Sequence, residues 1–266
     1  MMFTKQARGI RSKTGLTLLF TVLWLQATAG AAPLANPVFF QRATADYQAT
    51  QTRWQTATNV SPAGWQFARA CYTLADFATN DENRADLAVQ GIEACRKLIK
   101  AEPRSGPGHY WLGMNLGQLA RTELLGALSL VREMESEFKT AWNLDPAVDY
   151  AGAARSLGLL YREAPGWPTS IGSNHQAREW LERATRFSPD FPENWLVLTE
   201  SYVAWDETPK ARESLQQLAK IWLAARTNFT GVLWESNWAD WNARRAAAEA
   251  KLAQSGAPTK APRQTD

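Results

Sequence analysis

Three evenly spaced prolines constrain the fold of this chain more than any other feature. Pro103, Pro146 and Pro189 lie 43 residues apart. The segment Ala177–Ala184, just before Pro189, carries apolar residues at i, i+4 and i+7, which places them on one face of a helix. Proline ends such a helix because it cannot donate the backbone hydrogen bond and clashes with the preceding turn. The spacing therefore predicts a series of helical units that each end at a proline.

A second helix is predicted directly after Pro189. Pro192 suits its first turn, where the missing N–H of proline costs nothing. Trp195, Leu198 and Tyr202 then lie at i, i+3 and i+7, with the small Thr199 beside them, so a second helix can approach closely. The order A-x3-L-x2-A-x4-P followed by W-x2-L-T-x2-Y resembles the tetratricopeptide pattern.

Four hairpins of this kind can be aligned along the chain. Their helix-packing positions are Trp65, Ala68, Tyr72, Gly91, Cys95 and Leu98 in repeat one; His109, Leu112, Gly113, Leu116, Met134, Phe138 and Ala141 in repeat two; Ala154, Leu157, Gly158, Tyr161, Ala177, Leu181 and Ala184 in repeat three; and Trp195, Leu198, Thr199, Tyr202, Ala211, Leu215 and Leu218 in repeat four. The predicted fold class is all-α, a right-handed α-solenoid of about four tetratricopeptide-like hairpins.

A capping helix is expected at each end of the solenoid. The first covers about Pro37–Ala57 and is followed by a turn in which Ser61 is the N-cap and Pro62 the first helical residue. The second covers about Val232–Leu252 and carries a tryptophan stripe at 234, 238 and 241 that closes the end of the solenoid. Because the period exceeds the usual ~34 residues, extra length is expected at 78–84 and 164–174.

The N-terminal 31 residues have the features of a signal peptide. Four basic residues precede an apolar stretch, Leu16–Leu25, and the small residues Ala27–Ala31 fit the A-x-A cleavage rule. We therefore expect a periplasmic protein from which residues 1–31 are removed. Its mature chain should have a single helical domain over 32–254, a disordered tail over 255–266 and no transmembrane segment. Retention of the segment as an uncleaved anchor is the alternative.

Charge and motif content exclude several classes of function. Of 29 Lys+Arg and 26 Asp+Glu, residues 1–31 hold four bases and no acid, so the remainder has a net charge of −1 and no basic patch for nucleic acid. His109 and His175 are not at metal-ligand spacing, and no nucleophile or phosphate-loop signature is present. We therefore expect no cofactor, no metal and no enzyme activity.

The only cysteines, Cys71 and Cys95, lie on the two helices of repeat one. An exported compartment permits a disulfide between them. The alternative is that both are small buried apolar residues.

Two longer stretches go beyond a generic repeat. GPGHYWLGMNLGQLAR (Gly106–Arg121) with the helix up to Pro146, and RSLGLLYREAPGWPTSIGSNHQAREWLERA (Arg155–Ala184), resemble the T-component family of TRAP transporters. The resemblance implies a secreted, non-enzymatic protein that forms a ring-like homotrimer, docks a solute-binding protein and passes small ligands, hydrophobic ones included. The chain lacks the lipoprotein cysteine usual in that family.

Candidate binding residues fall into two groups. Trp167 lies in the loop Ala164–Gly172, whose prolines and glycines fix its path; it either contacts a ligand or partner, or packs onto the helices behind it. The concave face is lined mainly by the first helix of each hairpin, which gives Tyr110, Met114, Arg155, Leu159, Leu196 and Glu200, with Asn115 and Arg162 nearby.

Arg155 and Arg162 suit a ligand carboxylate through their bidentate geometry. The alternative is an ordinary ion pair, since Asp149 and Glu163 are close in sequence. Two functions are compatible with these candidate residues. One is a T-component-like oligomer that binds a ligand and docks a partner, and the other is a monomeric periplasmic scaffold that holds a peptide or envelope protein in its concave groove.

Overall fold

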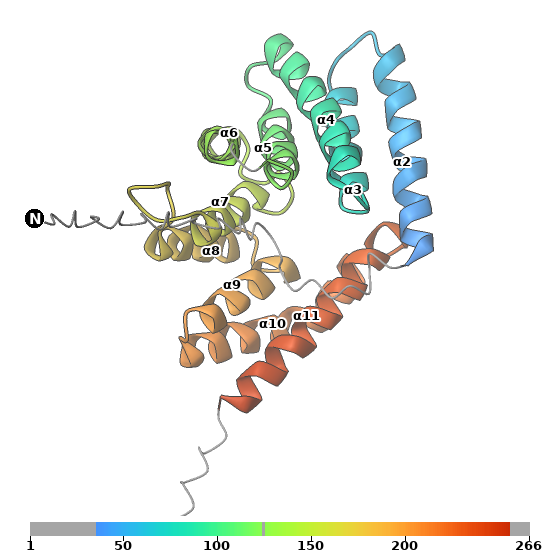
Figure 1. Ribbon diagram of the computed structural model, residues 1–266. Helices are drawn as coiled ribbons and strands as arrows, with labels where there is room; N and C mark the ends of the chain where they lie inside the picture. Colours follow the sequence, from blue (N-terminus) through green and yellow to red (C-terminus); the bar gives the residue numbers. More distant parts are fainter. Residues whose placement is uncertain (1–35, 124–125, 256–266) are drawn as a thin grey trace, which may run out of the picture.

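The computed structural model describes residues 36–123 and 126–255, so the predicted signal peptide and residues 256–266 of the predicted tail lie outside it. Within the described residues the chain is built from helices alone (Figure 1). They are α2 (Pro37–Thr56), α3 (Ala63–Ala75), α4 (Asp81–Ala101), α5 (Gly106–Ala120), α6 (Ala127–Leu144), α7 (Gly152–Glu163), α8 (Asn174–Phe187), α9 (Pro192–Ala204), α10 (Thr208–Asn228), the 3-10 turn η1 (Val232–Trp234) and α11 (Glu235–Gln254).

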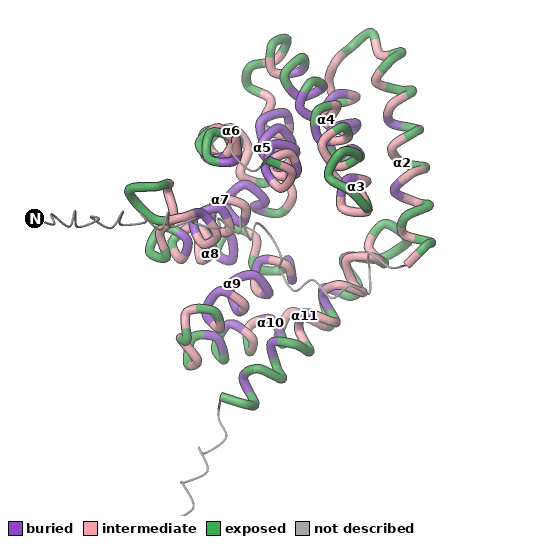
Figure 2. The backbone as a smooth tube through the Cα atoms, in the orientation of Figure 1, coloured by how far each residue is buried: buried purple, intermediate pink, exposed green. Residues whose placement is uncertain are grey.

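Four antiparallel hairpins, α3–α4, α5–α6, α7–α8 and α9–α10, follow one another around a curve. This confirms the predicted all-α solenoid of four repeats. The first helices α5, α7 and α9 are the most deeply buried, as the purple segments of Figure 2 show. Helix α2 packs on α3 and caps the N-terminal end, as expected.

The three helix ends that precede the evenly spaced prolines share one local structure. Helices α4, α6 and α8 each end two residues before Pro103, Pro146 and Pro189. At each end the C-cap N–H donates to the carbonyl four residues back: Glu102 to Leu98, Asp145 to Ala141 and Ser188 to Ala184. The same helix end is thus built three times, which explains the even spacing.

Two glycines let the hairpin helices pack closely. A Cβ on Gly113 would lie 2.6 Å from the ring of Phe138, and one on Gly158 would lie 2.5 Å from Leu181. Both contacts are shorter than packed carbon atoms allow, so α5–α6 and α7–α8 approach as they do only because these positions have no side chain.

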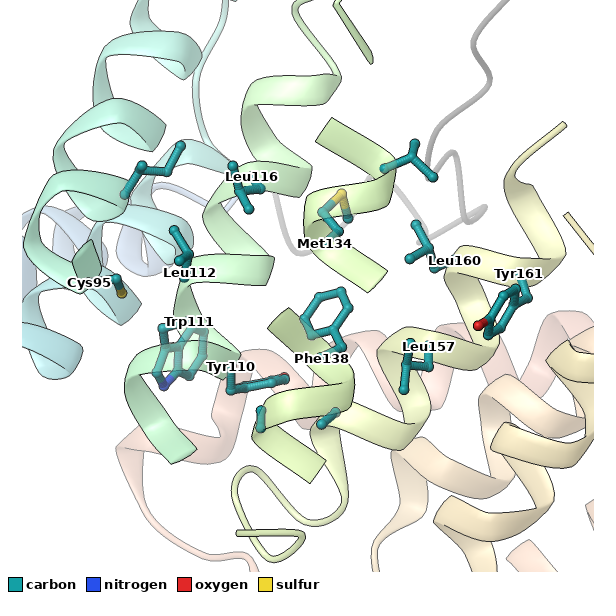
Figure 3. Packing of buried hydrophobic residues seen from close by; sticks show 14 of the residues in the cluster. Cys95, Tyr110, Trp111, Leu112, Leu116, Met134, Phe138, Leu157, Leu160 and Tyr161 are labelled. Atoms are coloured by element: carbon teal, nitrogen blue, oxygen red, sulfur yellow. The ribbon is translucent and has the colours of Figure 1, made fainter. Parts of the chain in front are cut away.

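The largest hydrophobic cluster spans repeats one to three. Figure 3 shows Leu112 and Leu116 of α5 facing one side of it, and Phe138 of α6 beside Leu157 of α7. The core residues predicted from the repeat pattern in this region are buried, including Ala68, Phe138 and Leu157.

Several local predictions were wrong. Pro62, not Ser61, is the N-cap position of α3, and it makes no side-chain capping bond. The extra length of repeat one lies mostly in the 21-residue helix α4 rather than in a loop, whereas that of repeat three lies in the loop before α8, as expected.

The two cysteines are buried free thiols, so the structure has no disulfide between Cys71 and Cys95. Burial raises the pKa of the Cys71 thiol to about 12, and it raises that of Cys95 as well. Both therefore behave as small apolar residues.

Among the described helices, none combines the length and the apolar character needed to cross a bilayer.

Candidate functional site

A pocket of about 350 Å³ lies on the inner face of the solenoid, and we call it the concave pocket. Helices α3, α5, α6, α7 and the start of α9 form its walls, and η1 and the first turn of α11 complete it. Its lining residues are Arg69, Tyr72, Thr73, Tyr110, Trp111, Met114, Gly117, Gln118, Arg121, Met134, Phe138, Asp149, Arg155, Ser156, Leu159, Leu160, Phe191, Glu193, Trp234 and Asn237.

The tryptophan stripe at 234, 238 and 241 packs at the C-terminal end of the solenoid, as expected. Helix α11 lies mainly against α9, the first helix of repeat four (Figure 1), and Trp238 also meets Trp222 of α10 with ring centroids 5.2 Å apart. Trp241 is fully buried, 5.5 Å from the Phe191 ring centroid, and its indole N–H donates to Glu193 at 2.6 Å. The C-terminal helix therefore covers the inner face of the last repeat.

Arg244 holds α11 to α9. Its buried guanidinium donates to Glu193 at 2.7 Å, to Glu200 at 2.8 Å and to Asp240 at 2.9 Å. Burial alone would raise the pKa of Glu193, but the positive charges of Arg244 and Arg155 together hold it below its usual value. The carboxylate thus stays ionised inside the fold.

Arg155 forms the polar end of the concave pocket. Its guanidinium donates to the Asp149 carboxylate at 2.5 Å, to Asn194 Oδ1 at 2.8 Å and to the carbonyls of Asp149 and Tyr150 at 3.3 Å. Tyr110 donates its hydroxyl to the same Asp149 oxygen at 2.6 Å. Burial, with the Asp149 charge next, raises the pKa of Tyr110 well above its ordinary value, so it remains a donor.

The backbone beside Arg155 is strained. Asp149, Tyr150 and Ala151 have φ values of 49°, 53° and 65°, a left-handed run without glycine. Such residues cost energy and persist only where surrounding contacts hold them. Here Arg155 binds two of the carbonyls, and the Tyr150 ring stacks on Phe191 with centroids 4.4 Å apart. The turn places Asp149 in the pocket.

The rest of the pocket is apolar, and its charges are largely paired. Met114 and Leu159 line it as predicted, beside the aromatic rings of Tyr72 and Trp234. Arg121 is 3.3 Å from Asp76, and Glu193 and Asp149 are bound by arginines as described. The site thus offers apolar walls with hydrogen-bonding groups at the Arg155 end, and further polar side chains at Arg69, Gln118 and Arg121.

The structure divides the predicted site residues. Tyr110, Met114, Arg155 and Leu159 meet in the concave pocket. Arg162 and Glu200 line a separate pocket of about 500 Å³ between α7, α9 and α11. For both arginines the alternative of an ordinary ion pair is what the structure shows: Arg155 pairs with Asp149, and Arg162 pairs with Glu163 at 2.6 Å.

Two predictions of concave exposure were wrong. Asn115 is fully buried, and its amide donates to the carbonyls of Ala68 at 3.0 Å and Trp111 at 2.8 Å. Leu196 is fully buried in the cluster that contains Trp241. Asn115 thus links α5 to α3 through a hydrogen bond, and Leu196 is covered by α11.

Trp167 is 89% exposed, so the interpretation that it packs onto the helices behind it was wrong. The loop around it is nevertheless well held: Gly172 N–H donates to Pro165 O at 2.8 Å, and Ser173 N–H donates to Tyr161 O at 2.8 Å. Trp167 is absent from the lining of either inner pocket. It is a separate surface feature.

Sequence reasoning missed Asp149, Phe191 and Trp234 as pocket residues. For Trp234 the signal was present in the 234, 238, 241 stripe. Asp149 was predicted only as a possible ion-pair partner of Arg155, because its place in the pocket depends on a left-handed turn that contains no glycine.

Comparison with known proteins supports the fold. The family model "Regulator of microtubule dynamics protein 1-3" matches residues 41–151, less than half of the 266 residues. The crystal structure of TTC0263, a thermophilic TPR protein in Thermus thermophilus, is similar with a TM-score of 0.52 and 23% identity, covering 82% of this chain and 98% of that one. No curated protein matches. The chain thus has a tetratricopeptide-like fold.

Proposed function

We propose that this protein is an exported, non-enzymatic helical-repeat protein that binds a small, mostly apolar ligand in the concave pocket. The observation that carries the proposal is the pocket itself. Its volume of about 350 Å³ lies in the ~300–1,000 Å³ range of ligand sites. Its walls are mostly aromatic, methionine and leucine side chains, with one group of hydrogen-bonding residues around Arg155 and another around Gln118 and Arg121.

The path of α11 favours a small ligand over a long peptide. A peptide-holding scaffold needs a continuous concave groove, and α11 covers that groove at repeat four, where Leu196 is buried and Glu200 is paired with Arg244. The monomeric scaffold that holds a peptide or envelope protein is therefore the second candidate, limited to the α3–α7 part of the concave face.

The exposed Trp167 supports partner docking as a second part of the function. Tryptophan is enriched among the residues that carry the binding energy of protein interfaces, and backbone hydrogen bonds hold the loop that presents Trp167. In the T-component-like role, the partner is a solute-binding protein of a TRAP-type transporter and the assembly is a homotrimer in the periplasm. Light scattering of the purified protein tests the assembly: a stable trimer supports this role, and a monomer at all concentrations favours the scaffold.

Titration with the neutral apolar dye N-phenylnaphthylamine tests ligand binding. Met114→Trp fills the pocket and should abolish the rise in dye fluorescence. Leu223→Trp adds the same side chain at a position that is 79% exposed on α10, so it serves as the matched control and should bind as the parent does. Equal binding by the parent and both variants would place the dye elsewhere and contradict the proposal.

A further inference from the structure

One wall of the concave pocket comes from the C-terminal segment of the described chain. Only Trp234 of η1 and Asn237 of α11 contribute to this wall. The anchors of α11, the buried Trp241 and the paired Arg244, lie further along the helix. The segment 232–237 lies before these anchors, and within it Trp234 packs against the rings of Phe229 and Trp241, with centroids 4.8 and 5.9 Å away.

Gly231 provides a pivot before this segment. Its φ and ψ are 86° and 176°, a region that is essentially restricted to glycine. A Cβ there would meet nothing within 4 Å, so the position is unconstrained by neighbours. The following Val232 and Leu233 are 56% and 85% exposed, so Trp234 makes the apolar packing of this segment.

One ion pair ties this segment to the opposite end of the solenoid. Arg42 of α2 donates to Glu235 at 2.5 Å, across 193 residues of sequence. Figure 1 shows the start of α11 beside the N-terminal end of α2, where the curve of helices comes back on itself. Both side chains are partly exposed, so the pair is weak enough to break and re-form readily.

From these observations, and resting on the proposed ligand site, we propose that residues 232–237 form a gate over the concave pocket, with Gly231 as its pivot and Arg42–Glu235 as its latch. When the latch is closed, Trp234 covers the pocket against Tyr150 and Phe191, with ring centroids 5.9 and 6.1 Å away. When it opens, ligand enters or leaves between α2 and α11.

Stopped-flow exchange of N-phenylnaphthylamine tests the gate. Glu235→Gln removes the latch charge at constant size, and it should raise the association and dissociation rates together by about 1.5- to 5-fold, the range that an exposed ion pair allows. High salt should raise the rates of the parent and leave the variant unchanged. Gly231→Ala should also raise both rates, because alanine disfavours the closed backbone.

The matched control is Glu249→Gln. Glu249 forms a similar partly exposed ion pair with Arg245 on the same helix, at 2.9 Å, away from the concave pocket. Its exchange rates should equal those of the parent. Equal rates for the parent and Glu235→Gln, with the dye bound, would overturn the gate and leave the ligand site standing.

Hydrogen exchange of the unliganded protein separates the two proposals. The amides of residues 232–237 should exchange faster in Glu235→Gln than in Glu249→Gln. If the dye fails to bind in the pocket while these amides respond, the ligand proposal fails and the mobile gate stands. If the amides of residues 232–237 exchange at the same rate in Glu235→Gln and Glu249→Gln, the gate proposal is wrong.

Discussion

Replacing Arg155 with methionine should destabilise the fold strongly, because Arg155 holds three features together. It neutralises Asp149, binds Asn194 of the next repeat, and stabilises the left-handed turn through two backbone carbonyls. Methionine keeps the apolar stem and removes the donors. The change leaves the Asp149 carboxylate without its charged partner and takes one donor from each of the two carbonyls.

The magnitude follows from burial. Removing one member of a buried ion pair costs ~3–5 kcal/mol, and Asp149 is 32% exposed at its side chain, so the lower end of that range applies. A loss of ~3 kcal/mol corresponds to a fall in melting temperature of about 6–12 °C for a domain of this size. Arg186→Met removes an exposed pair with Glu182 and should cost less than ~1 kcal/mol.

Urea unfolding followed by circular dichroism measures both variants, and the double variant Asp149→Asn/Arg155→Met completes the cycle. Because the double variant leaves no unpaired charge, its loss should be smaller than the sum of the two single losses. A loss below ~1 kcal/mol for Arg155→Met, or strict additivity, would refute the view that this cluster holds the turn.

Three further predictions concern other parts of the fold. The hydrogen bond that the His109 ring donates to the Glu137 carboxylate raises the pKa of His109. Its contribution to stability is therefore complete below the ordinary pKa near ~6.5 and is lost as pH rises through the raised value, and His109→Gln should flatten this dependence in melting curves. Gly113→Ala should cost ~1–3 kcal/mol by overpacking against Phe138. Thiol titration should find Cys71 and Cys95 unreactive in the native protein and both reactive in the denatured, unreduced one.

Each of these has a control or a contrary result. A pH profile that stays as steep in His109→Gln as in the parent would contradict the first prediction. Gly117→Ala should be nearly neutral, since its Cβ would meet only the flexible end of Met134 at 3.1 Å. A single reactive thiol or none in the denatured protein would show that the cysteines are not both free.

The sequence was sufficient for the repeats because their signals are local. A proline after each second helix, and small residues at 113 and 158, act within one hairpin, so the helices and most core positions could be predicted. The position of α11 depends on contacts between distant residues: Arg244 finds Glu193 and Glu200 only in three dimensions. No periodic pattern specifies that.

The candidate site was predicted in part for the same reason. Tyr110, Met114 and Leu159 follow from the register of the first helices. Leu196 belongs to the same register but is covered by α11, and Asp149 depends on a turn with no glycine to mark it. Arg155 lies in the concave pocket, as its helix register predicts, but its N–H groups are already bound to the turn at Asp149 and Tyr150.

The most direct test of the account is a crystal structure of the protein with N-phenylnaphthylamine bound. The account predicts density for the dye between Met114, Leu159 and Trp234, with the Arg155–Asp149 pair intact. Density confined to the pocket near Arg162 and Glu200 would contradict the assignment of the concave pocket as the ligand site.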